Sequence, residues 1–234
     1  MGNLPNPPED LFLEQSLFFL KRIKHTVTDT GVPCGSVLPR TFIKEHSMQP
    51  RFRALKTTIR TRLQEPGWAD FAEELEEMPA RELVGPLLSC LPLGGEAMER
   101  AAVALGRAVS RMAEEHIEEG RNVIRRLMWH MNEESGNIGW GIPEAFAEVL
   151  AQNRRLGDEF HSVLFSYITN TGKEDNFCDH DVLRRSCFRA AERLALARPD
   201  LAPKARGPFQ AGLRDEDPIC RDLAREALEK IGMF

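Results

Sequence analysis

The chain has 234 residues, of which 42% are hydrophobic and 29% are charged, a balance typical of a soluble globular protein with a substantial core. Its formal net charge of −5 argues against tight binding to nucleic acid or to anionic membranes, because both require a basic surface. No run of about 18 apolar residues is present, so we expect no membrane-spanning helix. We expect a cytoplasmic protein, since the N-terminus lacks signal-peptide features and the five cysteines include no CxxC.

The first 78 residues are expected to form an N-terminal helical cap that contains one long loop. Apolar residues recur at helical spacing from Leu11 to Ile23 and predict a first helix. Five glycines or prolines interrupt residues 26–50, which predicts a long ordered loop there. A basic amphipathic helix follows and ends at Pro66-Gly67, and an acidic helix then begins near Trp68. The apolar face of the basic helix consists of Phe52, Leu55, Ile59 and Leu63.

From Pro79 onward the sequence carries a repeated pattern. Its clearest copy is residues 213–232, in which an acidic turn precedes Pro218 at the first helical position and Gly232 ends the helix. The inward face of this copy is narrow and consists of Ala224, Ala227, Leu228 and Ile231. A shift of 37 residues superimposes Arg184, Cys187, Ala190, Ala191 and Leu194 on Arg221, Ala224, Ala227, Leu228 and Ile231. A shift of 123 residues superimposes Ala101, Ala104 and Leu105 on Ala224, Ala227 and Leu228.

Small residues thus recur where two helices must approach closely, and this pattern resembles the HEAT-like repeat family, in particular the short repeats of phycobilisome lyases. The resemblance covers residues 79–234 and implies an all-α fold, a right-handed superhelical solenoid of stacked helix pairs. We expect four antiparallel pairs: 80–91 with 95–115, 117–132 with 142–154, 157–170 with 179–197, and 202–212 with 217–232.

The hairpin between residues 125 and 144 is the strongest candidate for a recognition surface. Two tryptophans flank a cluster of carboxylates and amides, a combination suited to an aromatic, cationic or basic-peptide ligand. The candidate binding residues are Trp129, His130, Asn132, Glu133, Glu134, Asn137, Trp140, Glu144 and Glu148. The alternative is that Trp129 belongs to the core, that Trp140 plugs the hairpin, and that three glycines only supply its turn.

We find no pattern that predicts a catalytic site, a bound metal or a cofactor. The Cys178-Asp179-His180-Asp181 segment, with His161 on the preceding helix, could be imagined as a metal site. Asp179 or Asp181 is better explained as the N-cap of the following helix. Cys187 and Cys220 occupy helix positions where small core residues are expected.

The sequence therefore predicts a non-enzymatic scaffold or adaptor that binds a protein or peptide on the concave face of the solenoid and on the 129–148 hairpin. Two enzymatic alternatives stay open at this point. One is a protein similar to the HEAT-like DNA glycosylases, with Trp129 and Glu133 in the groove, although such proteins need a basic surface. The other is a chromophore lyase or carrier, which rests on the resemblance to the repeat family alone.

Overall fold

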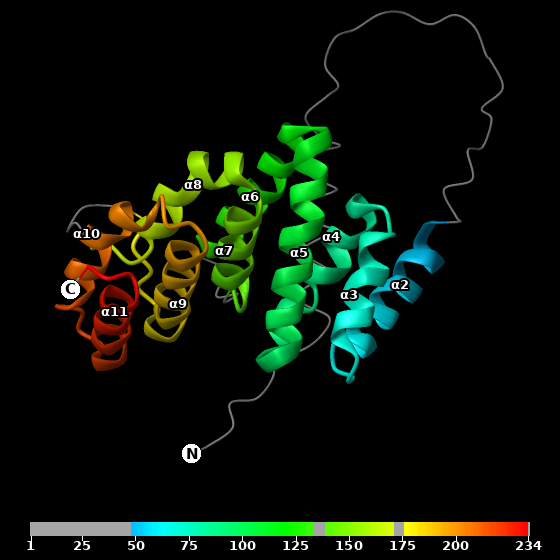
Figure 1. Ribbon diagram of the computed structural model, residues 1–234. Coiled ribbons are helices and arrows are strands. Elements are labelled where there is room, and N and C mark those ends of the chain that lie inside the picture. Colours follow the sequence, from blue (N-terminus) through cyan, green and yellow to red (C-terminus); the bar gives the residue numbers. More distant parts are fainter. Residues whose placement is uncertain (1–47, 133–138, 171–175, 234) are drawn as a thin grey trace, which may run out of the picture. The chain divides into compact units, whose positions relative to one another are not determined.

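The computed structural model describes residues 48–132, 139–170 and 176–233, and these residues form ten α-helices, one 3-10 helix and no β-strand (Figure 1). The elements are α2 (Met48–Arg62), α3 (Trp68–Glu76), α4 (Ala80–Leu88), η1 (Leu91–Leu93), α5 (Gly95–Glu115), α6 (Ile117–Met131), α7 (Ile142–Gln152), α8 (Arg154–Ser166), α9 (Asp181–Ala197), α10 (Ala202–Gly212) and α11 (Pro218–Lys230). The all-α prediction is therefore confirmed for this part of the chain. None of its helices is both long enough and apolar enough to cross a membrane.

The predicted helix between Leu11 and Ile23 lies outside the described residues, as does the predicted loop up to residue 47. The basic and acidic helices that follow are present as α2 and α3. Gly67 separates them with a φ of 91°, a conformation that favours glycine. Arg62 at the end of α2 pairs with Glu74 of α3 through two hydrogen bonds, of 2.8 and 3.2 Å, so the two charged helices partly neutralise each other.

The eight helices expected between residues 80 and 232 are all present, and α8 differs most from its expected bounds. It runs over Arg154–Ser166, whereas residues 157–170 were expected. Asn153 explains the difference. Its backbone N–H donates to the Val149 carbonyl at the end of α7, and its side chain accepts a hydrogen bond from the Leu156 N–H at the start of α8. One residue therefore ends one helix and caps the next, and no loop separates them.

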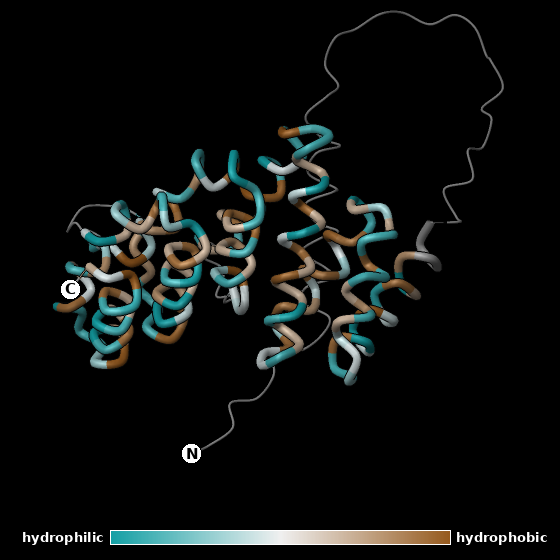
Figure 2. Tube along the Cα trace, in the orientation of Figure 1, coloured by the Kyte–Doolittle hydropathy of each residue, from teal (hydrophilic) through white to brown (hydrophobic). Residues whose placement is uncertain are grey.

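The second helix of each expected pair packs on the second helix of the following pair: α5 on α7, α7 on α9, and α9 on α11. Across the view in Figure 1 the helices run broadly in chain order, from α2 at one side to α10 and α11 at the other. Hydrophobic and hydrophilic segments alternate along the individual helices in Figure 2, as expected for amphipathic helices. The small residues of the repeated pattern are buried, among them Ala101, Cys187, Ala191, Ala224 and Ala227. The prediction that Cys187 and Cys220 belong to the core is confirmed.

Helices α2 and α3 contribute to the same hydrophobic core as α4 and α5. Ile59 of α2, Leu63 directly after it and Phe71 of α3 are fully or almost fully buried in it. Arg111 of α5 reinforces this contact, because its guanidinium donates hydrogen bonds to the carbonyls of Leu75, Glu76 and Met78 at the end of α3. The expected domain boundary between residues 78 and 79 stays a prediction.

Candidate functional site

Trp129 lies near the end of α6 with 60% of its surface exposed. The buried face of α6 consists of Gly120, Val123, Ile124 and Leu127, and Trp129 lies on another side of the helix. The interpretation of Trp129 as a core residue is therefore wrong. Asn132, the C-cap of the helix, is also exposed, and His130 is partly exposed. These three candidate residues thus lie together at the accessible end of α6.

Trp140 is half-buried in the turn before α7 and contacts the His180 ring edge-on, with ring centroids 5.8 Å apart. Two glycines beside it are required by the local packing. A Cβ at Gly139 would lie 2.9 Å from the carbonyl oxygen of His130, and Gly141 has a φ of 73°. The turn is therefore built for close contact, and Trp140 fixes it to the start of α9.

The acidic members of the predicted surface do not form one described cluster. Glu133, Glu134 and Asn137 lie outside the described residues. Glu148 is 6% exposed, and its carboxylate accepts hydrogen bonds from Arg193 Nε at 2.7 Å and from Gln152 Nε2 at 2.9 Å. Glu148 therefore holds α7 against α9. Its carboxylate is therefore not part of an exposed binding surface.

Glu144, one turn before Glu148 on α7, is half-buried. Its Oε2 atom is enclosed and receives no hydrogen bond from the part of the chain that the structure describes. An enclosed carboxylate oxygen is an acceptor that a donor from a bound group could satisfy.

The segment considered as a metal site has a structural role instead. His180 is the N-cap of α9, because its Nδ1 atom accepts a hydrogen bond from the Leu183 N–H at 3.2 Å. The expectation that Asp179 or Asp181 would be the cap is therefore wrong. His161 Nδ1 donates to the Gly157 carbonyl at 2.9 Å, one turn earlier in α8. In the described residues no three histidine, cysteine or acidic side chains are grouped so that they could hold a metal ion.

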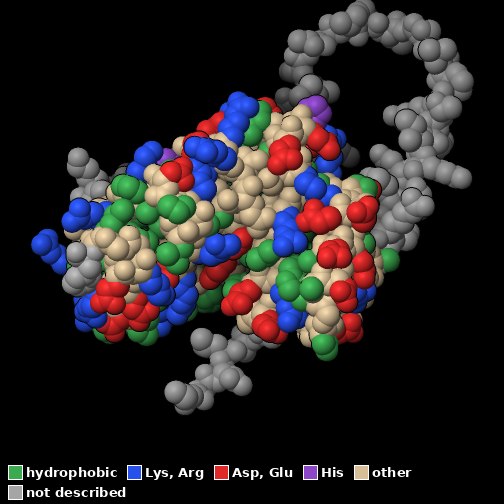
Figure 3. All heavy atoms as spheres, in the orientation of Figure 1, with side chains coloured by type: hydrophobic (Ala, Val, Ile, Leu, Met, Phe, Trp, Pro, Cys, Tyr) green, Lys and Arg blue, Asp and Glu red, His purple; other side chains and the backbone are tan. Residues whose placement is uncertain are grey.

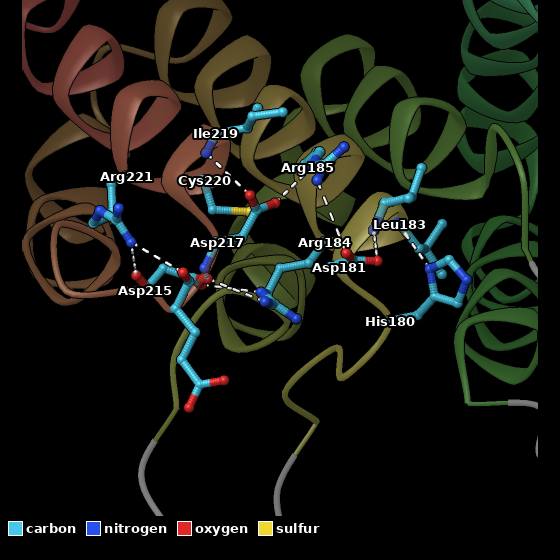
Figure 4. A network of polar contacts seen from close by, with 12 residues as sticks. His180, Asp181, Leu183, Arg184, Arg185, Asp215, Asp217, Ile219, Cys220 and Arg221 are labelled. Atoms are coloured by element: carbon cyan, nitrogen blue, oxygen red, sulfur yellow. Dashed lines mark hydrogen bonds and ion pairs between the residues drawn. The ribbon is translucent and has the colours of Figure 1, made fainter. Parts of the chain in front are cut away.

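A buried polar network joins α9 to the turn before α11 (Figure 4). Arg184 and Asp215 have side chains that are 7% and 4% exposed and pair in two hydrogen bonds of 2.9 and 3.0 Å. Asp215 also accepts the Asp217 backbone N–H at 2.9 Å. Beside them, Arg185 Nε donates to Asp217 at 2.6 Å, and Asp217 caps α11. The network therefore fixes the turn and the cap at the same time.

The network also displays the 37-residue repeat. Arg184 donates to the carbonyls of Cys178 and Asp179, which lie six and five residues before it. Arg221 donates to the carbonyls of Asp215 and Glu216, again six and five residues before it. The caps His180 and Asp217 are separated by the same shift. The pattern of the sequence therefore has a matching pattern of hydrogen bonds.

No protein-family model, curated protein or solved structure matches this chain. The repeated arginine and the repeated helix cap relate the start of α9 to the start of α11 within the chain itself.

The face of the described helices that Figure 3 shows carries neither an extended acidic nor an extended basic patch. In Figure 3, acidic and basic side chains are interspersed over the visible face of the described helices. Many arginines are neutralised by nearby carboxylates, such as Arg121, which pairs with Glu118 and Glu159. Nucleic-acid binding releases counterions only where the protein presents unneutralised positive charge.

Two cysteine thiols near this network differ in their expected reactivity. A hydrogen bond with Cys187 lowers the pKa of the Cys178 thiol, whereas burial raises the pKa of Cys220 to about 12. Only the thiolate form reacts with alkylating reagents. In a Cys34→Ser variant at pH 8, we expect iodoacetamide to label Cys178 first, as measured by peptide mass spectrometry. Cys220 should react only after unfolding in urea, and equal labelling rates for the two native thiols would contradict this prediction.

Proposed function

We propose that the protein is a non-enzymatic, cytoplasmic scaffold that binds a protein or peptide, and that its helix pairs form a short HEAT-like solenoid. The packing of α5, α7, α9 and α11 in series supports this architecture, as does the repeated arginine at positions 184 and 221. In such a solenoid the second helices line an extended concave surface. The binding surface that we propose combines this concave face with the 129–148 hairpin.

The exposure of Trp129 is the observation that carries the proposal. Its side chain is 60% exposed, while Trp68 and Trp140 are both partly buried. Tryptophan offers a large, rigid contact area and is among the residues that contribute most often to binding energy at interfaces. In the sequence, Trp129 lies just before the predicted acidic loop.

The test is a selection of peptides from a random display library on the immobilised full-length protein. We expect the dissociation constants of the selected peptides to rise at least about 30-fold in Trp129→Ala, corresponding to the loss of about 2 kcal/mol at an aromatic anchor. The unfolding free energy of this variant should change by no more than about 0.5 kcal/mol, as is usual at exposed sites.

The matched control is Leu196→Ala on α9, which removes another large hydrophobic side chain that is 46% exposed. This variant should retain the affinity of the wild-type protein. Peptides that bind Trp129→Ala as tightly as they bind the wild-type protein would refute the assignment of this surface.

A further inference from the structure

A cavity of about 380 Å³ opens between α4, α5 and α6, the helix that carries Trp129. Its apolar wall consists of Val84, Met112 and Val123, one from each of these helices. Its polar lining consists of Arg81, Glu119, Asn122 and Arg126. We call this cavity the Arg126 cleft.

Among the described residues, Arg126 is the charged group of this cleft that has no partner. Arg81 and Glu119 pair with each other at 2.5 Å, and Asn122 Oδ1 accepts a hydrogen bond from Arg125 Nη1 at 2.6 Å. The Arg126 guanidinium makes no hydrogen bond or ion pair with the residues that the structure describes. It still reaches solvent at the mouth of the cleft, but the surrounding protein atoms partly desolvate it and lower its pKa. A partly desolvated cation without a counter-ion favours the approach of an anion.

The neighbours of Arg126 limit the charge of that anion. Arg81 and Arg126 contribute two positive charges to the lining, and Glu119 contributes one negative charge. A singly charged group therefore balances the lining, whereas a doubly charged phosphate would be repelled by Glu119. The planar guanidinium matches a carboxylate in two parallel hydrogen bonds, and the apolar wall suits an aliphatic group next to it.

We propose that the Arg126 cleft binds a carboxylate carried next to an apolar side chain, in an acidic segment of the peptide or protein partner. This inference rests on the proposed function and names the chemistry of the partner. Trp129 follows Arg126 by three residues, so the two side chains are neighbours on the surface of α6. Arginine and tryptophan are both among the residue types that most often anchor an interface, and here they share one helix face.

A basic partner, which the sequence pattern favoured, depends on Glu133 and Glu134, and these lie outside the described residues. The lining of the Arg126 cleft, which is described, has a net positive charge. It therefore favours a partner that presents a carboxylate at this point.

The test is an NMR titration of the full-length, ¹⁵N-labelled protein with isocaproate, a branched pentanoate. Its amide serves as the uncharged analogue, and inorganic phosphate serves as a second anion. We expect the pentanoate to shift the backbone amide signals of residues 119–126 with a dissociation constant on the order of millimolar, as is typical of such a small ligand. The amide and the phosphate should bind at least about tenfold more weakly, in line with the strength of a charge-assisted hydrogen bond. Equal binding of the amide or of phosphate would overturn the proposal.

The decisive variant is Arg126→Met, which keeps most of the side-chain volume and removes the guanidinium. It should weaken pentanoate binding at least about tenfold, and Arg126→Lys, which keeps the charge but loses the planar fork, should weaken it less. The matched control is Arg189→Met, which removes an exposed arginine of α9. Circular dichroism verifies that all variants fold, and unchanged binding in Arg126→Met would overturn the proposal.

Two peptides distinguish the possible sources of the carboxylate. One has blocked ends and an internal glutamate between leucines, and the other has no acidic residue and a free leucine C-terminus. Binding of the glutamate peptide that depends on Arg126 supports the proposal, whereas binding of only the peptide with the free C-terminus overturns the assignment to an acidic segment. If neither peptide binds while the pentanoate does, the assignment to a peptide partner is overturned. Failure of the proposed function is a separate result, namely display-selected peptides that are indifferent to Trp129→Ala.

Discussion

The Arg184→Met variant is expected to lose about 3–5 kcal/mol of unfolding free energy, because it leaves the buried Asp215 carboxylate without its counter-ion. Only 4% of the Asp215 side chain is exposed, so solvent cannot replace the two hydrogen bonds from Arg184. The same substitution also leaves the Cys178 and Asp179 carbonyls without the Arg184 donor. Urea unfolding followed by circular dichroism measures the loss.

Two further variants separate the loss of the ion pair from the loss of an arginine as such. Arg225→Met breaks the exposed pair with Asp222, whose side chains are 50% and 63% exposed, and should cost no more than about 1 kcal/mol. Adding Asp215→Leu to Arg184→Met removes both buried charges and should restore part of the stability. A loss in Arg184→Met no larger than that in Arg225→Met would show that the buried pair does not hold α9 to the turn before α11.

The Gly106→Ala variant is expected to destabilise the protein by about 1–3 kcal/mol, the usual range for an overpacked core. Gly106 lies within α5, where alanine normally stabilises a helix by about 1 kcal/mol relative to glycine. The structure reverses this expectation. A Cβ at this position would lie 2.9 Å from the backbone carbonyl carbon and oxygen of Glu148 on α7. Backbone atoms cannot rotate away, so the two helices must separate.

Gly207→Ala is the matched control for this reversal of sign. Gly207 lies within α10, and a Cβ there would meet no atom within 4 Å. Pro208 follows directly, and its ring partly opposes the helical backbone of a residue with a Cβ, so this variant should change the unfolding free energy by less than about 1 kcal/mol. Thermal or urea unfolding of both variants gives the comparison, and stabilisation by Gly106→Ala would show that α5 and α7 are not in close contact at this residue.

The candidate surface is only partly accounted for by the pattern of the sequence. Trp129 was singled out because it and Trp140 flank a cluster of carboxylates and amides, and it is exposed. Glu148 was grouped with it as an acidic residue on the helix that follows the turn. The structure pairs Glu148 with Arg193, 45 residues later in the chain, and this pairing explains how a carboxylate can be buried in α7. Arg126 was not among the candidate binding residues. Its sequence neighbours do not reveal that Val84 and Met112 form the opposite wall of its cleft.

What the sequence determined by itself is the set of helices and the faces that they bury. Apolar periodicity and the placement of glycine and proline are local properties, and they located α4 to α11 and the small buried residues of the 37-residue repeat. Which side chains lie opposite one another was decided by the tertiary structure alone. Arg184 meets Asp215 across 31 residues of chain, and the Arg126 cleft draws its lining from three helices. Periodicity identifies the face that a helix turns inward, but the partner of each polar group depends on how neighbouring helices are registered against it.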